Sequence, residues 1–261
     1  MKITIIGAGN MGGAIARGLA QGSMIKATDL TVTARTQKTL DKLSNDVVGI
    51  NTTLNNAKAV EDADIVMLAV KPWLIKDIIS EIKPVLDFNK TMIVSIVAGI
   101  SFDEMKSLLC EKATMFRVIP NTAISIKQSP TLMCCFNATQ EQTLCVKKLF
   151  DELGQTFILE ERLMAAGTAI TSCGIAYAFE YIKAAIQGAI ELGFYPHVAK
   201  AMIDQTVMGA AALLETNGSM PEEEIYKVCT PGGITIKGLN EMSAQGFDNA
   251  VISGLKKAAG T

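Results

Sequence analysis

The chain has 261 residues, of which 49% are apolar and 19% are charged, and its formal net charge is −2. This apolar fraction excludes wholesale disorder, and the length suits one large domain or two smaller ones. Binding to nucleic acid needs a clustered basic surface, which neither the net charge nor any long run of like charges provides. We therefore expect a globular protein whose main partner is not nucleic acid.

No targeting or membrane segment is predicted. The N-terminal apolar run turns at Gly7 and is too short for the apolar core of a signal peptide. The longest uncharged stretch, residues 163–179, contains Gly, Thr, Ser and Cys and falls short of a span of about 20 apolar residues. The sequence thus indicates a cytoplasmic protein that does not enter a membrane.

The first 160 residues alternate short strand-like runs with helix-like stretches. The predicted strands are 2–6, 30–34, 65–70, 91–97, 114–119, 131–136 and 156–159, and the predicted helices are 11–21, 36–43, 73–85, 102–110 and 140–153. The run 65–70 is continuously apolar, as in a strand buried on both faces of a parallel sheet. We therefore predict an α/β, doubly wound, Rossmann-type domain over residues 1–160.

A glycine-rich loop directly follows the first predicted strand: Gly7-Ala8-Gly9-Asn10-Met11-Gly12. Gly7 permits a tight turn, Gly9 lets the backbone approach a pyrophosphate, and Gly12 lets the next helix pack close to the strand. The N-terminus of that helix faces the anion. A glycine-rich turn without a ligand is the alternative, but the strand before the loop and the helix after it favour a dinucleotide site.

The end of the second predicted strand bears on the choice of cofactor. NAD enzymes usually place an acid about 20 residues past the loop, and residues 31–38 contain none. Arg35 offers a guanidinium fork to a 2′-phosphate, with Thr36 and Lys38 behind it. The pattern favours NADPH over NADH, and a solvated loop arginine is the alternative.

Two further strand ends are expected at the same crevice, because ligands of open α/β sheets bind at the C-terminal ends of the strands. One strand ends at Val70-Lys71-Pro72 and the next at Val97-Ala98-Gly99. We predict that Val70, Lys71 and Ala98 line the cofactor, although Lys71 alone would also suit an ordinary loop.

Residues 161–261 lose the strand signal and are expected to form a helical domain. The stretches 174–192 and 200–214 are apolar on almost every face, and such helices must be buried. A helical domain of about 100 residues has difficulty burying two of them alone. We therefore predict that this half packs against a second subunit, in a homodimer or larger homo-oligomer.

The helical half contains one glycine pair, within Thr230-Pro231-Gly232-Gly233-Ile234-Thr235, ahead of a predicted helix 236–242. A Pro-Gly-Gly turn that runs into a helix presents free backbone N–H groups, which suit a carboxylate. The hydroxyls of Thr230 and Thr235 would add hydrogen bonds. Helix capping by a loop threonine is the alternative interpretation.

The cysteines and the histidine suggest neither a metal site nor a hydrolase. The six cysteines, Cys110, Cys134, Cys135, Cys145, Cys173 and Cys229, have no metal-ligand spacing. They lie in apolar surroundings, and we interpret them as reduced core thiols. His197 follows Pro196 at a helix start and has no nucleophile motif beside it.

Four segments come in the order and spacing of the pyrroline-5-carboxylate reductase family, which the chain resembles essentially from end to end. They are the glycine loop, Ala69-Val70-Lys71-Pro72, Arg117-Val118-Ile119-Pro120-Asn121-Thr122 and Thr230-Pro231-Gly232-Gly233-Ile234-Thr235-Ile236. Many dehydrogenases share the glycine loop, whereas the P-N-T and P-G-G-x-T elements are much more specific. The resemblance implies reduction of the cyclic imine of 1-pyrroline-5-carboxylate to L-proline by NADPH or NADH, the last step of proline biosynthesis.

The resemblance also implies roles for single residues. Thr235 would be the catalytic residue, its hydroxyl donating a hydrogen bond to the ring nitrogen or accepting one from it, and the N–H groups of Ile234 and Thr235 would hold the carboxylate. Asn56, Val70, Lys71 and Ala98 would line the cofactor, and Arg35 and Thr36 would meet the adenosine phosphate. Glu161 matches a family carboxylate near the substrate.

The chain departs from the family pattern in three places. Residues 171–176 read T-S-C-G-I-A where the family has S-G-S-G-P-A, Ala123 replaces the proline after P-N-T, and Ala165 or Ala166 replaces an acid. These changes concern substrate preference and rate, not the fold. Reduction of a protonated imine needs positioning more than acid–base groups, which agrees with the scarcity of histidine.

Two other functions fit parts of the pattern. A β-hydroxyacid dehydrogenase would need a catalytic lysine on the first long helix of the second half, where Lys183 and Gln187 lie, but the expected G-x-x-G-x-G run is absent. A non-catalytic NADP(H)-binding regulatory relative is the other alternative, and the changed segment 171–176 is consistent with it.

Overall fold

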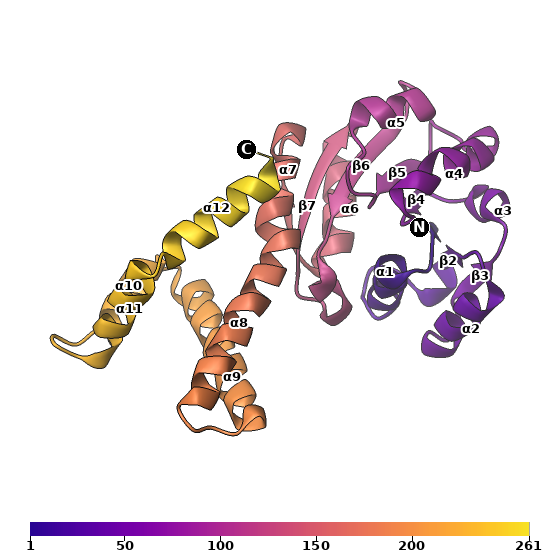
Figure 1. Ribbon diagram of the computed structural model, residues 1–261. Coiled ribbons are helices and arrows are strands. Elements are labelled where there is room, and N and C mark those ends of the chain that lie inside the picture. Colours follow the sequence, from indigo (N-terminus) through magenta and orange to yellow (C-terminus); the bar gives the residue numbers. More distant parts are fainter. Residues whose placement is uncertain (261) are drawn as a thin grey trace. The chain divides into compact units, whose positions relative to one another are not determined.

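The computed structural model describes residues 1–260, which form two compact units: Met1–Ser172, and a second unit that begins at Cys173 (Figure 1). All the strands of the described chain belong to the first unit, and the second unit is helical. The predicted class, an α/β sheet followed by helices, is confirmed.

The first unit is built on an eight-stranded sheet with the order β3-β2-β1-β4-β5-β6-β7-β8. The strands are β1 (Ile3–Ile6), β2 (Leu30–Thr33), β3 (Asn51–Thr53), β4 (Ile65–Leu68), β5 (Met92–Ser95), β6 (Thr114–Ile119), β7 (Ser129–Phe136) and β8 (Gly154–Ile158). Only β6 and β7 pair antiparallel. The order from β3 to β6 is that of a doubly wound dinucleotide-binding sheet.

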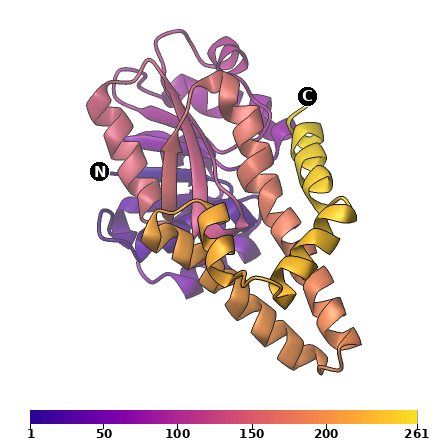
Figure 2. The same ribbon diagram turned by 90° about the vertical axis from the view of Figure 1, so that its left-hand side faces the viewer.

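Helices cover both faces of this sheet (Figures 1 and 2). They are α1 (Asn10–Ala20), α2 (Gln37–Asp46), α3 (Asn56–Val60), α4 (Ile75–Ile82), α5 (Phe102–Leu108), α6 (Gln140–Asp151) and α7 (Met164–Thr168). Residues of α1, α2 and α6 form one core with Ile65 and Met67 of β4, and residues of α3, α4, α5 and α7 form the other with Val66 and Leu68. The strand β4 is thus buried on both faces, as its apolar run predicts.

Strand β3 and helix α3 were not predicted from the sequence. The strand has only three residues, Asn51, Thr52 and Thr53, and lies at the edge of the sheet beside β2. All three side chains are polar and none is buried, so the apolar alternation that marks a half-buried strand is absent. Helix α3 has five residues, too few for a helical period to show.

The segment from Glu161 to Ser172 belongs to the first unit by its packing. Met164 and Ala169 are buried, and a Cβ on Gly167 would lie 2.7 Å from Cδ1 of Leu132 on β7. A π-helical turn, Ala169–Cys173, follows α7 and leads into the second unit. The change from strands to helices near residue 160 therefore comes twelve residues before the division in packing at Ser172.

The second unit consists of helices with little buried surface of their own. They are α8 (Gly174–Glu191), α9 (Pro196–Asn217), α10 (Pro221–Val228), α11 (Ile234–Ala244) and α12 (Phe247–Ala259). Helix α8 has no buried residue and α9 only Ala199, whereas Phe179 is 59% exposed and Met208 58% exposed. A single chain therefore leaves many apolar side chains of α8 and α9 exposed. None of the described helices is long and apolar enough to cross a bilayer.

The interpretation of all six cysteines as core residues is wrong for Cys135. Successive residues of a strand point to opposite faces, and on β7 this buries Cys134 and exposes Cys135. The other four cysteines are half-buried, and all six are free thiols. Burial raises the pKa of the Cys134 thiol to about 11, so this thiol stays protonated at neutral pH.

Candidate functional site

A pocket of about 720 Å³ lies at the C-terminal ends of β1, β2, β4 and β5. The strand register produces it: Ile6 pairs with Thr33 and with Leu68, and Leu68 pairs with Ser95. The next residue of each strand therefore comes out at one edge of the sheet, and all four line the pocket: Gly7, Ala34, Ala69 and Ile96. The sheet order reverses between β1 and β4, which is where such folds bind ligands.

The glycine loop follows β1 into this pocket. Gly7 has φ 108°, and its N–H donates to the carbonyl of Thr33 at 3.1 Å. A Cβ on Gly12 would lie 1.9 Å from the Gly7 carbonyl oxygen and 2.9 Å from Cβ of Ala69. Gly12 does not line the pocket; its lack of a side chain brings α1 against the end of β1, as expected.

The start of α1 is open to an anion. Its N-cap is Gly9, with no side-chain capping bond and no acid in the first turn, and Gly9, Asn10 and Met11 line the pocket together with Ala8. A Cβ on Gly9 would meet no protein atom within 4 Å. The fold itself therefore does not require glycine here, whereas close approach of a phosphate to the backbone does.

The predicted phosphate-binding residues Arg35 and Thr36 line the pocket at the end of β2. Thr39 also lines it, and its hydroxyl lies 2.9 Å from the Thr36 hydroxyl. Thr39 was missed from the sequence, although residues three apart on a helix share a face. Thr36 is the N-cap of α2, and its side chain makes no capping bond.

Asn56 is held rigidly at the pocket wall. Its Oδ1 accepts from the Thr33 hydroxyl at 2.6 Å, and its Nδ2 donates to Oε2 of Glu81 at 2.9 Å. Val70 and Lys71 line the pocket as expected, whereas Ala98 is not among its lining residues. At the end of β5 that position belongs to Ile96, and Ala98 lies two residues further along the loop and is exposed.

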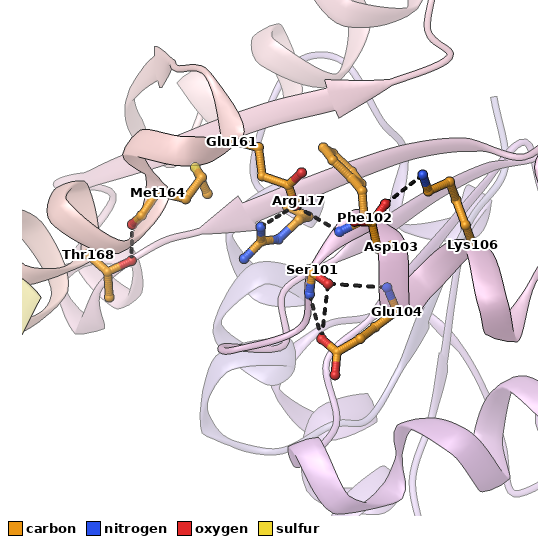
Figure 3. Close-up of polar contacts among 9 residues, drawn as sticks. All are labelled: Ser101, Phe102, Asp103, Glu104, Lys106, Arg117, Glu161, Met164 and Thr168. Carbon is orange, nitrogen blue, oxygen red and sulfur yellow. Dashed lines mark hydrogen bonds and ion pairs between the residues drawn. The ribbon is translucent and has the colours of Figure 1, made fainter. Parts of the chain in front are cut away.

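Glu161 lies outside this pocket and is engaged with two other segments of the first unit (Figure 3). Its Oε1 accepts from Nη1 of Arg117 at 2.6 Å and from the backbone N–H of Phe102 at 2.8 Å. Nearby, the backbone N–H and hydroxyl of Ser101 hold the pKa of Glu104 below its ordinary value. No role for Arg117 was predicted, although its motif was one of the four that carry the resemblance.

The Thr230–Thr235 segment of the second unit forms a turn that leads into α11. The Gly233 N–H donates to the Thr230 carbonyl at 2.9 Å, and Gly232 has φ 72°, as the third position of a type II turn requires. A Cβ on Gly233 would lie 2.4 Å from the Thr230 hydroxyl oxygen. Both glycines are thus needed for the shape of the turn.

This turn leaves the start of α11 uncapped. The N-cap is Gly233, without a side-chain capping bond, and the first turn contains no acid. The alternative that a threonine caps this helix is therefore wrong. Thr235 is exposed, and its hydroxyl has no hydrogen-bond partner within residues 1–260. The free backbone N–H groups at this helix start can bind a carboxylate, and the Thr235 hydroxyl can hydrogen-bond a polar group beside that carboxylate.

The fold and the pocket are those of a dinucleotide-binding protein. A family model described as "Pyrroline-5-carboxylate reductase dimerisation" matches residues 161–261, and one described as "NADP oxidoreductase coenzyme F420-dependent" matches residues 2–99.

Named relatives and one solved structure each match this chain over nearly its whole length. Pyrroline-5-carboxylate reductases 1 and 2 of Dictyostelium discoideum are 36% and 32% identical over 97% and 99% of this chain. The chain spans 48% of the first relative and 91% of the second. The structure of a pyrroline-5-carboxylate reductase from Coxiella burnetii superposes with a TM-score of 0.93, 27% identity and coverage of 99% of this chain and 96% of that one. The chain belongs to the pyrroline-5-carboxylate reductase family.

Gly9 and Gly12 of the loop predict different outcomes for the same substitution. Gly12→Ala places its Cβ against main-chain atoms and is expected to lower the free energy of unfolding by about 1–3 kcal/mol or more. Gly9→Ala enters open space and is expected to cost under about 1 kcal/mol, while weakening dinucleotide binding. Urea unfolding and a fluorescence titration with NADPH measure the two effects. Equal stability of the two variants would contradict the packing role of Gly12.

Proposed function

We propose that this protein reduces 1-pyrroline-5-carboxylate to L-proline with a nicotinamide dinucleotide, the last step of proline biosynthesis. The observation that carries the proposal is the uncapped start of α11, where free N–H groups and the unpartnered Thr235 hydroxyl occur together. A planar imine with one carboxylate next to its nitrogen needs this combination. Family membership supports the same substrate.

The pocket of the first unit fits the cofactor. The start of α1 and the open space at Gly9 suit the pyrophosphate, and Arg35, Thr36 and Thr39 suit a 2′-phosphate. The 2′-phosphate would then lie at the end of β2 and the pyrophosphate at the end of β1, the neighbouring strand in the sheet. The nicotinamide end is then expected over β4 and β5, near Lys71, Ile96 and Ala98. When bound, the cofactor supplies the hydride.

The residues of this chain bind and orient the imine. The N–H groups of Ile234 and Thr235 hold the carboxylate, with Thr230, Gly232 and Gly233 shaping the turn. The Thr235 hydroxyl hydrogen-bonds the ring nitrogen and fixes the plane of the C=N bond. A protonated imine is already electrophilic, so positioning and exclusion of water are the main requirements.

The decisive assay follows NADPH oxidation with 1-pyrroline-5-carboxylate. A six-membered cyclic imine and a 3-hydroxy acid with NADP⁺ are the comparison substrates. Turnover of the five-membered imine supports the proposal, whereas turnover of the hydroxy acid alone would favour a β-hydroxyacid dehydrogenase. Cofactor binding without turnover of any imine would favour a regulatory protein.

Lys183, the lysine that a β-hydroxyacid dehydrogenase would need, forms an exposed ion pair with Glu180 one turn away on α8, at 2.5 Å. This environment is that of an ordinary surface lysine. Lys183→Ala is therefore expected to keep full activity in the NADPH oxidation assay, which would remove the β-hydroxyacid dehydrogenase alternative.

We also propose that the protein acts in the cytosol. Six free thiols, one of them exposed at Cys135, suit a reducing compartment.

Arg35 is expected to set a preference for NADPH over NADH. Its side chain lines the pocket, and no carboxylate follows β2 to bind a ribose hydroxyl. Arg35→Asp replaces a charge-assisted bond with repulsion, so the Kd for NADPH should rise at least about tenfold more than that for NADH. Titration of both cofactors measures the ratio, and an equal loss for both would remove this role.

The helical unit is expected to form an obligate homodimer or larger oligomer. Apolar side chains of α8 and α9 are exposed in the single chain, among them Phe179, Met208 and Leu213, and monomers rarely expose apolar patches of such extent. Sedimentation at nanomolar concentration should show an assembly of at least two chains. A stable, active monomer would contradict the proposal.

Thr235 is expected to act on the substrate rather than on the fold. A hydrogen bond to a charged group contributes about 1.5–3 kcal/mol, so Thr235→Ala should lower kcat/KM about 10- to 150-fold. The melting temperature and the NADPH affinity should not change, because the hydroxyl is exposed and unpartnered. Thr235→Ser should retain most of the activity. Full activity of Thr235→Ala, or a loss explained by unfolding, would refute the catalytic assignment.

A further inference from the structure

Arg117 is a charged residue on an inner strand of the sheet. It lies on β6, between Ser95 of β5 and Cys134 of β7. Its side chain is only 11% exposed, and its Nε is buried without a hydrogen-bond partner in the described chain. Burial of a guanidinium is unfavourable unless the charge is paired. The partner that pairs with this buried charge therefore shows which parts of the structure Arg117 connects.

The partner of Arg117 is Glu161, which also binds the start of α5 (Figure 3). One carboxylate oxygen accepts from Arg117 and from the backbone N–H of Phe102, the first residue of α5. The guanidinium also lies 5.9 Å from the centre of the Phe102 ring. The pair thus connects three segments that are distant in sequence: β6, the segment that begins at Glu161, and the loop before α5.

The start of α5 is further fixed by a capping box. The Ser101 hydroxyl accepts from the Glu104 N–H at 3.2 Å, and the Glu104 carboxylate accepts from the Ser101 N–H at 2.9 Å. The N–H of Phe102 takes no part in this box, and Glu161 is its partner. Glu161 therefore restrains Phe102, the first residue after the loop that precedes α5, from outside the helix.

This loop, residues 96–101, reaches the dinucleotide pocket at its other end. Ile96 lines the pocket, and the loop contains Ala98 and Gly99, which has φ 79°. On the proposed function, the nicotinamide end of the cofactor is expected over β4 and β5, beside this loop. Only a few residues therefore separate the atoms that would face the nicotinamide from the ion pair that anchors the loop.

The Arg117–Thr122 motif, which contains Arg117, also binds the far end of the segment that begins at Glu161. Asn121 is 6% exposed, and its Nδ2 donates to the carbonyl of Thr171 at 3.3 Å. The Ser172 hydroxyl donates to the Pro120 carbonyl at 3.2 Å. The Arg117–Thr122 motif thus restrains residues 161–172 at both ends, which gives a physical reason for its residue types.

We propose that Arg117 and Glu161 are positioning residues that fix the 96–101 loop against the nicotinamide end of the cofactor, and that Glu161 acts through the loop rather than by contact with the substrate. This inference rests on the proposed function for the identity of the cofactor.

The main test separates positioning from substrate contact. Glu161→Gln retains an oxygen that can accept from Phe102 but removes the charge paired with Arg117. We expect NADPH affinity to fall about 3- to 10-fold, and kcat to fall about 10- to 100-fold through misplacement of the ring. The KM for the imine should change less than kcat. Affinity for 2′-phospho-ADP-ribose, which lacks the nicotinamide, should not change.

A double-mutant cycle tests whether the two residues act together. If Glu161 acts with Arg117, then Glu161→Gln combined with Arg117→Met should cost little more in NADPH affinity than the worse single variant. Arg117→Lys, which keeps the charge, provides a milder variant should Arg117→Met not fold, and it should lie between wild type and Arg117→Met. Glu160→Gln is the matched control, because Glu160 pairs with Arg162 at 2.6 Å on the surface, where both side chains are more than two-thirds exposed.

Three results would overturn the proposal. The first is a rise in the KM for the imine alone, with NADPH affinity and kcat unchanged, which would make Glu161 a substrate ligand. The second is a change in melting temperature alone, which would make the pair purely structural. The third is an equal loss of affinity for NADPH and 2′-phospho-ADP-ribose. The two binding arms do not require turnover, so they remain informative even if wild-type protein reduces no imine and the proposed function fails.

Discussion

The dinucleotide pocket depends on one main-chain contact that has no room for a side chain. The Gly7 carbonyl and the backbone of Gly12 lie so close that a Cβ on Gly12 would be 1.9 Å from the carbonyl oxygen. This contact brings the start of α1 to the edge where β1, β2, β4 and β5 end in register. Arg35, Lys71 and Ile96 then reach the pocket because their strands are paired with β1 directly or through β4.

The starts of α1 and α11 differ from those of α5 and α6 in how their backbone N–H groups are satisfied. Helices α5 and α6 begin with complete capping boxes, Ser101 with Glu104 and Thr139 with Gln142. Helices α1 and α11 begin at glycines, without side-chain caps and without acids in the first turn. A capping side chain would compete with an anion for the same N–H groups. Helix α12 also begins at an uncapped glycine, Gly246, but has an acid, Asp248, in its first turn. The starts of α1 and α11, which lack that acid, coincide with the proposed pyrophosphate and carboxylate positions.

The sequence predicted most of the sheet and the pocket because those features have strong local signals. Buried parallel strands are continuously apolar, and a glycine loop between strand and helix has a fixed spacing. The edge strand β3 has neither signal, since all of its residues are polar. Thr39 lies three residues after Thr36 at the start of α2, so helical spacing could have indicated it. The anchoring of Glu161 could not be predicted, because it depends on a contact with Arg117, 44 residues away in the sequence. Cys135 was misplaced because local hydropathy does not show to which face of β7 a residue points.

The departures from the family pattern become interpretable once the contacts of the connecting segment are known. Residues 169–173 form a π-helical turn, and Asn121 binds it through the main-chain carbonyl of Thr171. A main-chain bond does not depend on the side chain at that position, so threonine in place of serine leaves the anchor unchanged. Ser172, where the family has glycine, adds a bond to the Pro120 carbonyl. The changes at positions 171 and 172 thus keep one restraint on residues 161–172 and add another. Accordingly, the residues at positions 171 and 172 give no reason to regard the chain as a relative that has lost its activity.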